Sequence, residues 1–214
     1  DEAIRVGHPD AVQAAITAEL RKGLRERDAE AHARGLRWAR LRPDLVQVPV
    51  LSDSLPNASA AQRDSIHALL GELHGLPGGG ARVQAALEAE RSLAEQARAE
   101  GRLRSVILAA KAVQAWSLIE RALPALAWAG ETTRRSLREA LREASERGHA
   151  LSASALAPLL SHPLSEVRTL AISLLRKSGI ARPWPLVRPT GPGVCFAGTE
   201  QTKRLLGLCE DGFE

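Results

Sequence analysis

Apolar residues recur along most of this chain with a helical period, and the alternating pattern of strands is almost absent. Residues 164–177 are the clearest case, because apolar side chains fall at i, i+3, i+4, i+7 and i+8: Val167, Leu170, Ala171, Leu174 and Leu175. On a helix these positions form a single apolar stripe. Pro163 stands before the stripe and Gly179 after it, at typical helix boundaries. The pattern therefore predicts an amphipathic helix over residues 164–177.

The same period predicts further helices upstream. Their expected ranges are 131–147, 102–118, 81–99 and 58–74, with a helix pair over 9–22 and 24–40 that is broken at Gly23. The segment 43–52 is rich in Val, but Pro49 favours an extended connector or a short helix over a strand. Gly78–Gly80 after Pro77 is the strongest loop signal.

The C-terminal part of the chain differs in composition. Residues 180–193 hold four prolines and two glycines, which cannot continue a helix and favour an extended course over the surface. Residues 199–209 could form one short final helix, and Trp184 is interpreted as a clasp packed on the body rather than an exposed ligand motif. We therefore expect a helical domain over 1–179 and a Pro/Gly-rich extension over 180–214.

Four segments share an apolar start, a turn, a helix with small residues and a closing Gly. They cover 159–179 (LLSHPLSEVRTLAISLLRKSG), which is the best copy, and 6–23, 55–75 and 130–148. Aligning Gln13, Arg63, Arg135 and Arg168 gives spacings of 50, 72 and 33 residues. A two-helix unit cannot bury its apolar stripe alone, so stacked neighbours would form a continuous core. The pattern resembles the HEAT repeat, although its period is irregular.

This resemblance implies an all-α, right-handed solenoid of roughly nine to eleven helices. In the HEAT family, an arginine at the positions of Arg63 and Arg168 bonds across to a neighbouring unit, which implies a structural role for these two residues. The leading interpretation is a non-catalytic scaffold or adaptor whose concave face binds another protein.

Composition limits the compartment and the chemistry. The chain has 214 residues, 44% apolar and 25% charged, which is typical of a folded, soluble protein. It contains no apolar run long enough for a bilayer, so we expect no membrane partner. Cys195 and Cys209 are expected to be unpaired thiols in a reducing, cytoplasmic compartment. The chain starts at Asp1 without Met and shows no signal segment, so we expect either a trimmed chain or an excised domain.

The sequence contains no recognisable catalytic or metal-binding motif. Gly78–Gly80 lacks the Lys-Ser/Thr of a phosphate loop, and no Gly-x-Ser-x-Gly elbow occurs. His67 and His74 are seven residues apart on one expected helix, which is too far for a single metal ion. Acidic residues such as Glu88 share their helix with arginines and indicate a solvated face. We therefore lean towards a non-enzyme and expect no cofactor and no metal.

Charge supplies the alternative interpretation, a nucleic-acid-binding protein. Lys and Arg number 29 and Asp and Glu 25, a net charge of +4. Basic residues concentrate in two sets of candidate contacts: Arg34, Arg37, Trp38, Arg40 and Arg42 in the first, and Arg134, Arg135, Arg138 and Arg142 in the second. Arginines can neutralise phosphates without reading bases. In this case the protein would be expected in the nucleus or nucleoid.

A shared fold adds an enzymatic version of this alternative. HEAT-like folds include alkylpurine DNA glycosylases, which hold a duplex in a basic groove and use aromatic and acidic residues at the lesion. Trp38, Trp116 and Trp128 could supply the aromatic groups, but there is no Tyr and no Asp near Trp116 or Trp128. Packing in the core or between repeats explains the tryptophans more simply.

Overall fold

The computed structural model describes residues 1–25 and 28–177, and within these ranges the chain is helical and has no strand. The expected all-α class is therefore confirmed for this part. The α-helices are α1 (Glu2–Val6), α2 (Pro9–Arg25), α3 (Ala29–Leu41), α4 (Val48–Ser54), α5 (Ala60–Gly75), α6 (Gly79–Gln96), α7 (Glu100–Ala112), α8 (Trp116–Arg121), α9 (Glu131–Glu146), α10 (Ala153–Leu156) and α11 (Ser165–Lys177). Short 3₁₀ helices lie between them: η1 (Pro43–Leu45), η2 (Leu55–Asn57), η3 (Leu123–Ala127) and η4 (Ala157–Ser161).

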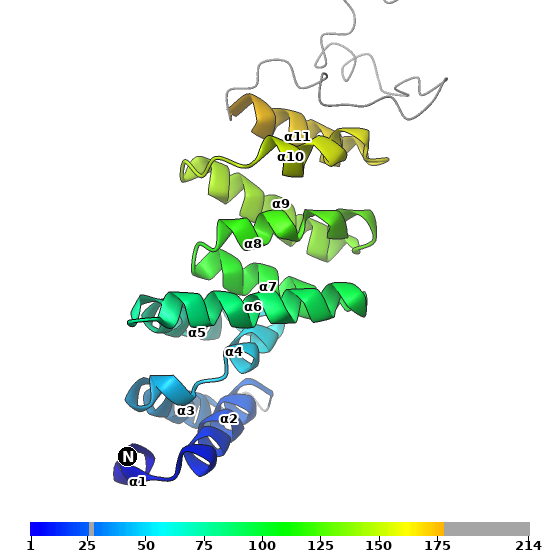
Figure 1. The fold of residues 1–214 in the computed structure, drawn as a ribbon. Helices are drawn as coiled ribbons and strands as arrows, with labels where there is room; N and C mark the ends of the chain where they lie inside the picture. The colour runs from blue at the N-terminus through cyan, green and yellow to red at the C-terminus, as the bar shows by residue number, and fades with distance from the viewer. Residues whose placement is uncertain (26–27, 178–214) are drawn as a thin grey trace, which may run out of the picture.

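The elements follow one another in space in the order of the chain. Figure 1 shows them rising in successive layers from α1 at one end to α11 at the other. The predicted extension over 180–214, its final helix and both cysteines lie outside the described residues. The segment 43–52 forms η1 and most of α4 rather than a strand.

Gly23 does not break a helix, and that expectation is wrong. Helix α2 runs through Gly23 to Arg25. A Cβ at Gly23 would lie 2.4 Å from the backbone N and Cα of His32 in α3, so the glycine allows α2 and α3 to cross closely. Asp28 is the N-cap residue of α3 and accepts a hydrogen bond from the Ala31 N–H at 3.0 Å.

The helix expected over 102–118 is two helices. Helix α7 ends at Ala112 and α8 begins at Trp116. Gln114 has φ of +57°, a left-handed conformation that ends α7 and reverses the chain. Val113 and Ala115 on either side of it are buried, so the apolar pattern continues through the turn and conceals it.

The glycine loop is also shorter than expected. Gly78 has a φ of +71°, but Gly79 and Gly80 already belong to α6. A Cβ at Gly79 would lie 1.9 Å from the Leu73 carbonyl oxygen, which requires glycine at this first position of the helix. The triplet therefore combines a left-handed turn with a tight helix start.

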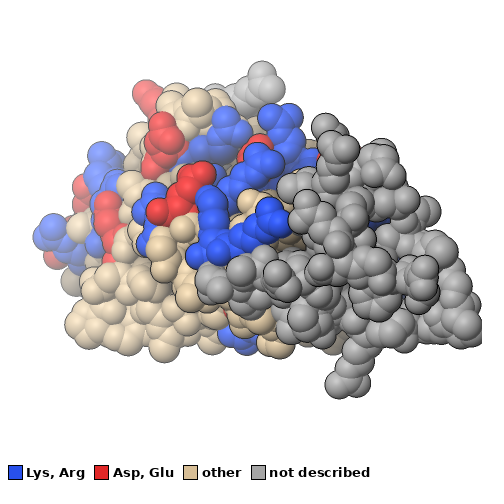
Figure 2. All heavy atoms as spheres, turned by 90° about the horizontal axis from the view of Figure 1, so that it is seen from above, with Lys and Arg blue, Asp and Glu red and all other residues tan. Residues whose placement is uncertain are grey.

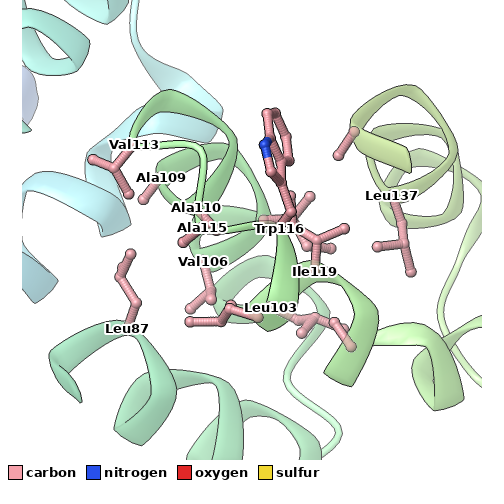
Figure 3. Packing of buried hydrophobic residues seen from close by; sticks show 14 of the residues in the cluster. Leu87, Leu103, Val106, Ala109, Ala110, Val113, Ala115, Trp116, Ile119 and Leu137 are labelled. Carbon is pink, nitrogen blue, oxygen red and sulfur yellow. The ribbon is translucent and has the colours of Figure 1, made fainter. Parts of the chain in front are cut away.

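One continuous core runs the length of the described stack, from Ile4 to Leu175. Figure 3 shows side chains of α6, α7, α8 and α9 converging in its middle, among them Leu87, Val106, Ile119 and Leu137. Burying one such side chain stabilises the fold by about 1.5–3 kcal/mol. Trp116 belongs to this core and is 8% exposed, whereas Trp38 and Trp128 are partly buried and pack against it.

Two glutamates join successive layers through backbone groups. The Glu100 Oε1 atom accepts the Gly130 N–H at 2.7 Å, and the Glu120 Oε1 atom accepts the Ser152 N–H at 2.6 Å. Gly130 and Ser152 are the N-cap residues of α9 and α10. Each carboxylate therefore satisfies a donor at the start of a helix 30 or 32 residues further along.

Three other side chains make comparable bonds. Gln62 donates to the Gly23 carbonyl at 3.2 Å, and Arg82 to the Pro43 carbonyl at 2.7 Å, each 39 residues away. The His162 Nε2 atom lies 3.3 Å from the Leu126 carbonyl oxygen, 36 residues away. The arginine expected to bond to a neighbouring unit behaves differently, because Arg168 donates to the His162 and Pro163 carbonyls just before its own helix.

Candidate functional site

The two predicted sets of basic residues lie on different layers. Arg34, Arg37, Trp38 and Arg40 belong to α3 with Arg42 just after it, whereas Arg134, Arg135, Arg138 and Arg142 belong to α9. Figure 1 shows α4 to α8 between these two helices. The structure therefore does not bring the nine residues together on one surface patch.

In the first set, Arg34 and Arg40 are held by glutamates of neighbouring helices. Arg34 donates through Nε and Nη2 to Glu19 in α2 at 3.0 and 2.7 Å. Arg40 binds both carboxylate oxygens of Glu72 in α5 at 2.8 and 3.0 Å. These hydrogen bonds raise the pKa of both guanidinium groups. The two arginines connect α3 to its neighbours, and a phosphate would have to displace a carboxylate from each.

The other three residues of the first set also have acidic partners. Asp1 lies 3.3 Å from the Arg37 Nε atom and accepts the Trp38 indole N–H at 3.1 Å. Arg42 binds both oxygens of Asp44 at 3.2 and 3.1 Å, and this hydrogen bond lowers the pKa of the Asp44 carboxyl. The set is therefore a network of ion pairs, and much of its positive charge is compensated locally.

In the second set, Arg138 connects α9 to α11. Its side chain is 15% exposed, and its guanidinium donates to Glu131 at 2.6 Å and to Glu166 at 2.5 Å. Arg135 pairs with Glu139 at 3.0 Å. Arg142 differs, because it forms no ion pair or hydrogen bond with any residue that the structure describes.

An open groove of about 920 Å³ runs between α9 and α11 beside Arg138. Its lining holds four cationic side chains and four carboxylates, so its formal charge is zero: Arg135, Arg138, Arg142 and Lys177, and Glu131, Glu139, Glu146 and Glu166. Figure 2, which looks onto the α11 end, shows Lys and Arg beside Asp and Glu over one side of the molecule, whereas other residues form most of the opposite edge. We call the groove lined by these residues of α9 and α11 the α9–α11 groove.

The α11 wall of the groove carries hydroxyl groups at every fourth residue. Ser165, Thr169 and Ser173 line it and are exposed, and Lys177 continues the same edge. These hydroxyls can donate to and accept from peptide groups. The apolar stripe over residues 164–177 predicts the helix but not this hydroxyl-bearing edge. The signal was available as the four-residue spacing of Ser, Thr and Lys beside the apolar stripe.

A second hollow, of about 580 Å³, lies where α3 and α5 begin, and His32 lines it with neutral residues. His32 is 8% exposed, and burial lowers its pKa, so its imidazole is neutral. Neither ring nitrogen has a partner, but both are themselves buried. A ligand in the hollow could not reach them unless the ring moved, so this hollow offers no site for proton transfer.

The acidic and histidine residues outside these two hollows are bound in ion pairs or lie apart from one another. Glu88 binds Arg91, and this hydrogen bond lowers the pKa of the Glu88 carboxyl. His67 is partly buried, which lowers its pKa. Among the described residues, no three His, Cys, Asp or Glu side chains gather where they could hold a metal ion.

Comparisons with known proteins return no relative for this chain. No protein-family model matches it, and neither does any curated protein or solved structure. In the described ranges, every helix is too short or too polar to cross a membrane.

Proposed function

We propose that this chain is a HEAT-like α-solenoid that serves as a non-catalytic scaffold and binds another protein in the cytoplasm. The layered order of the helices supports the architecture. The side-chain bonds to backbone groups support it as well, because they join residues 30 to 39 positions apart, about one repeat. The right-handed course of the solenoid remains a prediction.

The α9–α11 groove is the observation that carries the proposed function. Its lining holds cations and carboxylates in equal number, and Arg142, Glu146 and Lys177 form no ion pair with another described residue. A protein segment can present side chains of both signs to such a surface, and charge complementarity of this kind selects partners. The hydroxyls of α11 add hydrogen-bonding groups for its backbone.

Nucleic acid has less support as a ligand. A phosphate backbone repeats one sign of charge, and in the groove it would meet one carboxylate for each cation. A glycosylase-like activity is also weakly supported, because Trp116 is a core residue. Binding through the two arginine sets remains an alternative prediction.

Site-specific photo-crosslinking tests the protein-binding proposal. A photoreactive residue at Thr169 samples the groove, and the matched control is Ser117, which is exposed on α8 outside the groove. In cell extract we expect a discrete protein adduct at Thr169, loss of that adduct when Ser173→Trp fills the groove, and no such adduct at Ser117. Adducts that are identical at both positions, or unaffected by Ser173→Trp, contradict the proposal.

A gel shift with duplex DNA at low salt distinguishes the nucleic-acid alternative from the protein-binding proposal. The proposal predicts no shift that depends on Arg37, Arg40 and Arg42. A shift that weakens with salt and disappears in the triple variant R37A/R40A/R42A would establish the nucleic-acid interpretation instead.

A further inference from the structure

The charged residues of the α9–α11 groove are paired at one end of the groove. Near the starts of the two helices, Arg138 donates to Glu131 at 2.6 Å and to Glu166 at 2.5 Å. Arg135 is bound to Glu139 at 3.0 Å. Figure 1 shows α9 and α11 running in the same direction, so their last turns lie on the same side of the stack. The cations near the helix starts therefore already have carboxylate partners, and a ligand gains little there.

The other end of the groove, formed by the last turns of α9 and α11, holds the unpaired charges. Arg142 and Lys177 line this end, are exposed and form no ion pair in the described chain. Glu146 lines the groove in the last turn of α9 and is also unpaired. Two cations of the lining therefore stand against one carboxylate.

The residues around this end do not supply the missing negative charge. Glu143 follows Arg142 in the chain, but Lys111 binds Glu143 at 2.8 Å and Arg147 binds it at 2.9 Å. Each helix C-terminus contributes roughly half a negative charge, which is less than the charge of the cations gathered there. Even without Arg176, which has an interaction of its own, this end of the groove keeps a positive excess.

We propose that this end of the α9–α11 groove recognises an acidic side chain, so that the partner segment carries an Asp or Glu that binds Arg142 and Lys177. The inference rests on the proposed function of the groove and names the chemistry of the partner. A guanidinium and an ammonium group can donate to the same carboxylate. A polyanion fits less well, because its further charges would meet Glu139 and Glu166 in the same lining.

The length of the α11 wall sets the length of the segment. From Ser165 to Lys177 the helix rises by about 18 Å, a distance that roughly five or six residues of extended chain span. Thr169 and Ser173 offer hydroxyl groups to the backbone of the segment, and Leu170 adds an apolar side chain to the lining. We therefore expect the acidic residue at one end of such a segment, beside Lys177.

Selection from a displayed library of short random peptides, with the whole chain as target, tests the inference. Peptides that bind through the groove are those that the Ser173→Trp variant fails to retain. We expect these peptides to be enriched in Asp or Glu on the parent chain, and in Lys or Arg on the charge-reversed variant R142E/K177E. The same charge composition on both targets would overturn the inference and leave the proposed function standing. If no peptide depends on the groove, the proposed function fails and the inference fails with it.

Fluorescence anisotropy of one enriched peptide measures the contribution of each cation. Arg142→Gln and Lys177→Gln are each expected to raise the Kd by roughly threefold to tenfold. The matched controls are Arg21→Gln and Arg98→Gln, which remove exposed arginines without an ion pair in the described chain. Each control should change the Kd by less than about twofold. Equal effects of the controls and the two groove variants would overturn the assignment.

A change in the peptide completes a double-mutant cycle. Replacing its acidic residue by the corresponding amide should weaken binding to the parent chain as much as R142Q/K177Q does. The same replacement should cause no further loss with R142Q/K177Q, because the carboxylate then has no cationic partner to lose. Losses that simply add would show that the carboxylate binds elsewhere, against the inference.

The chain's own acidic residues Glu210, Asp211 and Glu214, which lie outside the described residues, are the competing occupant. If a partner is the occupant, the whole-chain variant E210Q/D211N/E214Q should bind the peptide with a Kd within about twofold of the parent. A Kd lower by about tenfold or more would show that the chain fills its own groove. That result would overturn the assignment of the site to a partner.

Discussion

Gly23 and Gly71 both lie inside long helices, but only Gly23 faces another backbone. A Cβ at Gly23 would approach His32 to 2.4 Å, whereas nothing lies within 4 Å of one at Gly71. We expect Gly23→Ala to lower the free energy of unfolding by about 1–3 kcal/mol through overpacking. We expect Gly71→Ala to raise it by about 0.5–1 kcal/mol through helix propensity. Urea unfolding measures both, and equal effects of the two variants would contradict the close crossing of α2 and α3.

A second prediction for single residues concerns the pKa of the Glu88 carboxyl. Its hydrogen bond to Arg91, reinforced by Arg121 at 3.4 Å, holds its carboxyl pKa below the usual range. The pairing of Glu88 with Arg91 therefore stabilises the folded state above the ordinary pKa of a glutamate. This stabilisation is lost as pH falls through the lowered pKa of Glu88. We expect Arg91→Ala to return the Glu88 pKa towards its ordinary value in an NMR titration. Arg98→Ala, which removes an arginine without an ion pair in the described chain, should leave the Glu88 pKa where it is.

Whole helices can be predicted from this sequence wherever the apolar period is uninterrupted. Helices α9 and α11 lie within two residues of their predicted bounds because each has one continuous stripe. The helix ends that were predicted wrongly have local causes that the period of apolar residues does not show. The left-handed Gln114 divides a pattern that remains apolar, and Gly23 has the composition of a helix break but the role of a crossing point.

The bonds between layers could not be predicted, because they join residues 30 or more positions apart. Removing the acceptor with Glu100→Ala or Glu120→Ala leaves a helix-start N–H without its protein partner. We expect each variant to lose about 1 kcal/mol of stability in urea unfolding, and the double variant to lose the sum. Glu139→Ala, which removes only an exposed pair with Arg135, is expected to change it by less than about 0.5 kcal/mol. Losses no larger than this control would show that the two bonds do not stabilise the stack.

For the molecule as a whole, the sequence shows where basic residues cluster but not which acidic residues pair with them. The nine candidate residues of the two sets cluster along the chain, yet the acidic partners of several of them come from other elements of the fold. Arg34, for example, binds Glu19, and Arg138 binds Glu166 across the groove. The groove forms only where α9 and α11 come together, so no single segment of the sequence contains its whole lining.

The distance between the two basic sets tests the layered fold most directly. Spin labels are attached to cysteines that replace the exposed Arg37 and Arg135, after Cys195 and Cys209 are changed to Ser. Several packed helices, each about 8–10 Å from the next, separate α3 from α9. Electron–electron resonance should therefore give a distance above about 25 Å. A distribution centred below about 20 Å would place both sets on one surface and contradict the stack.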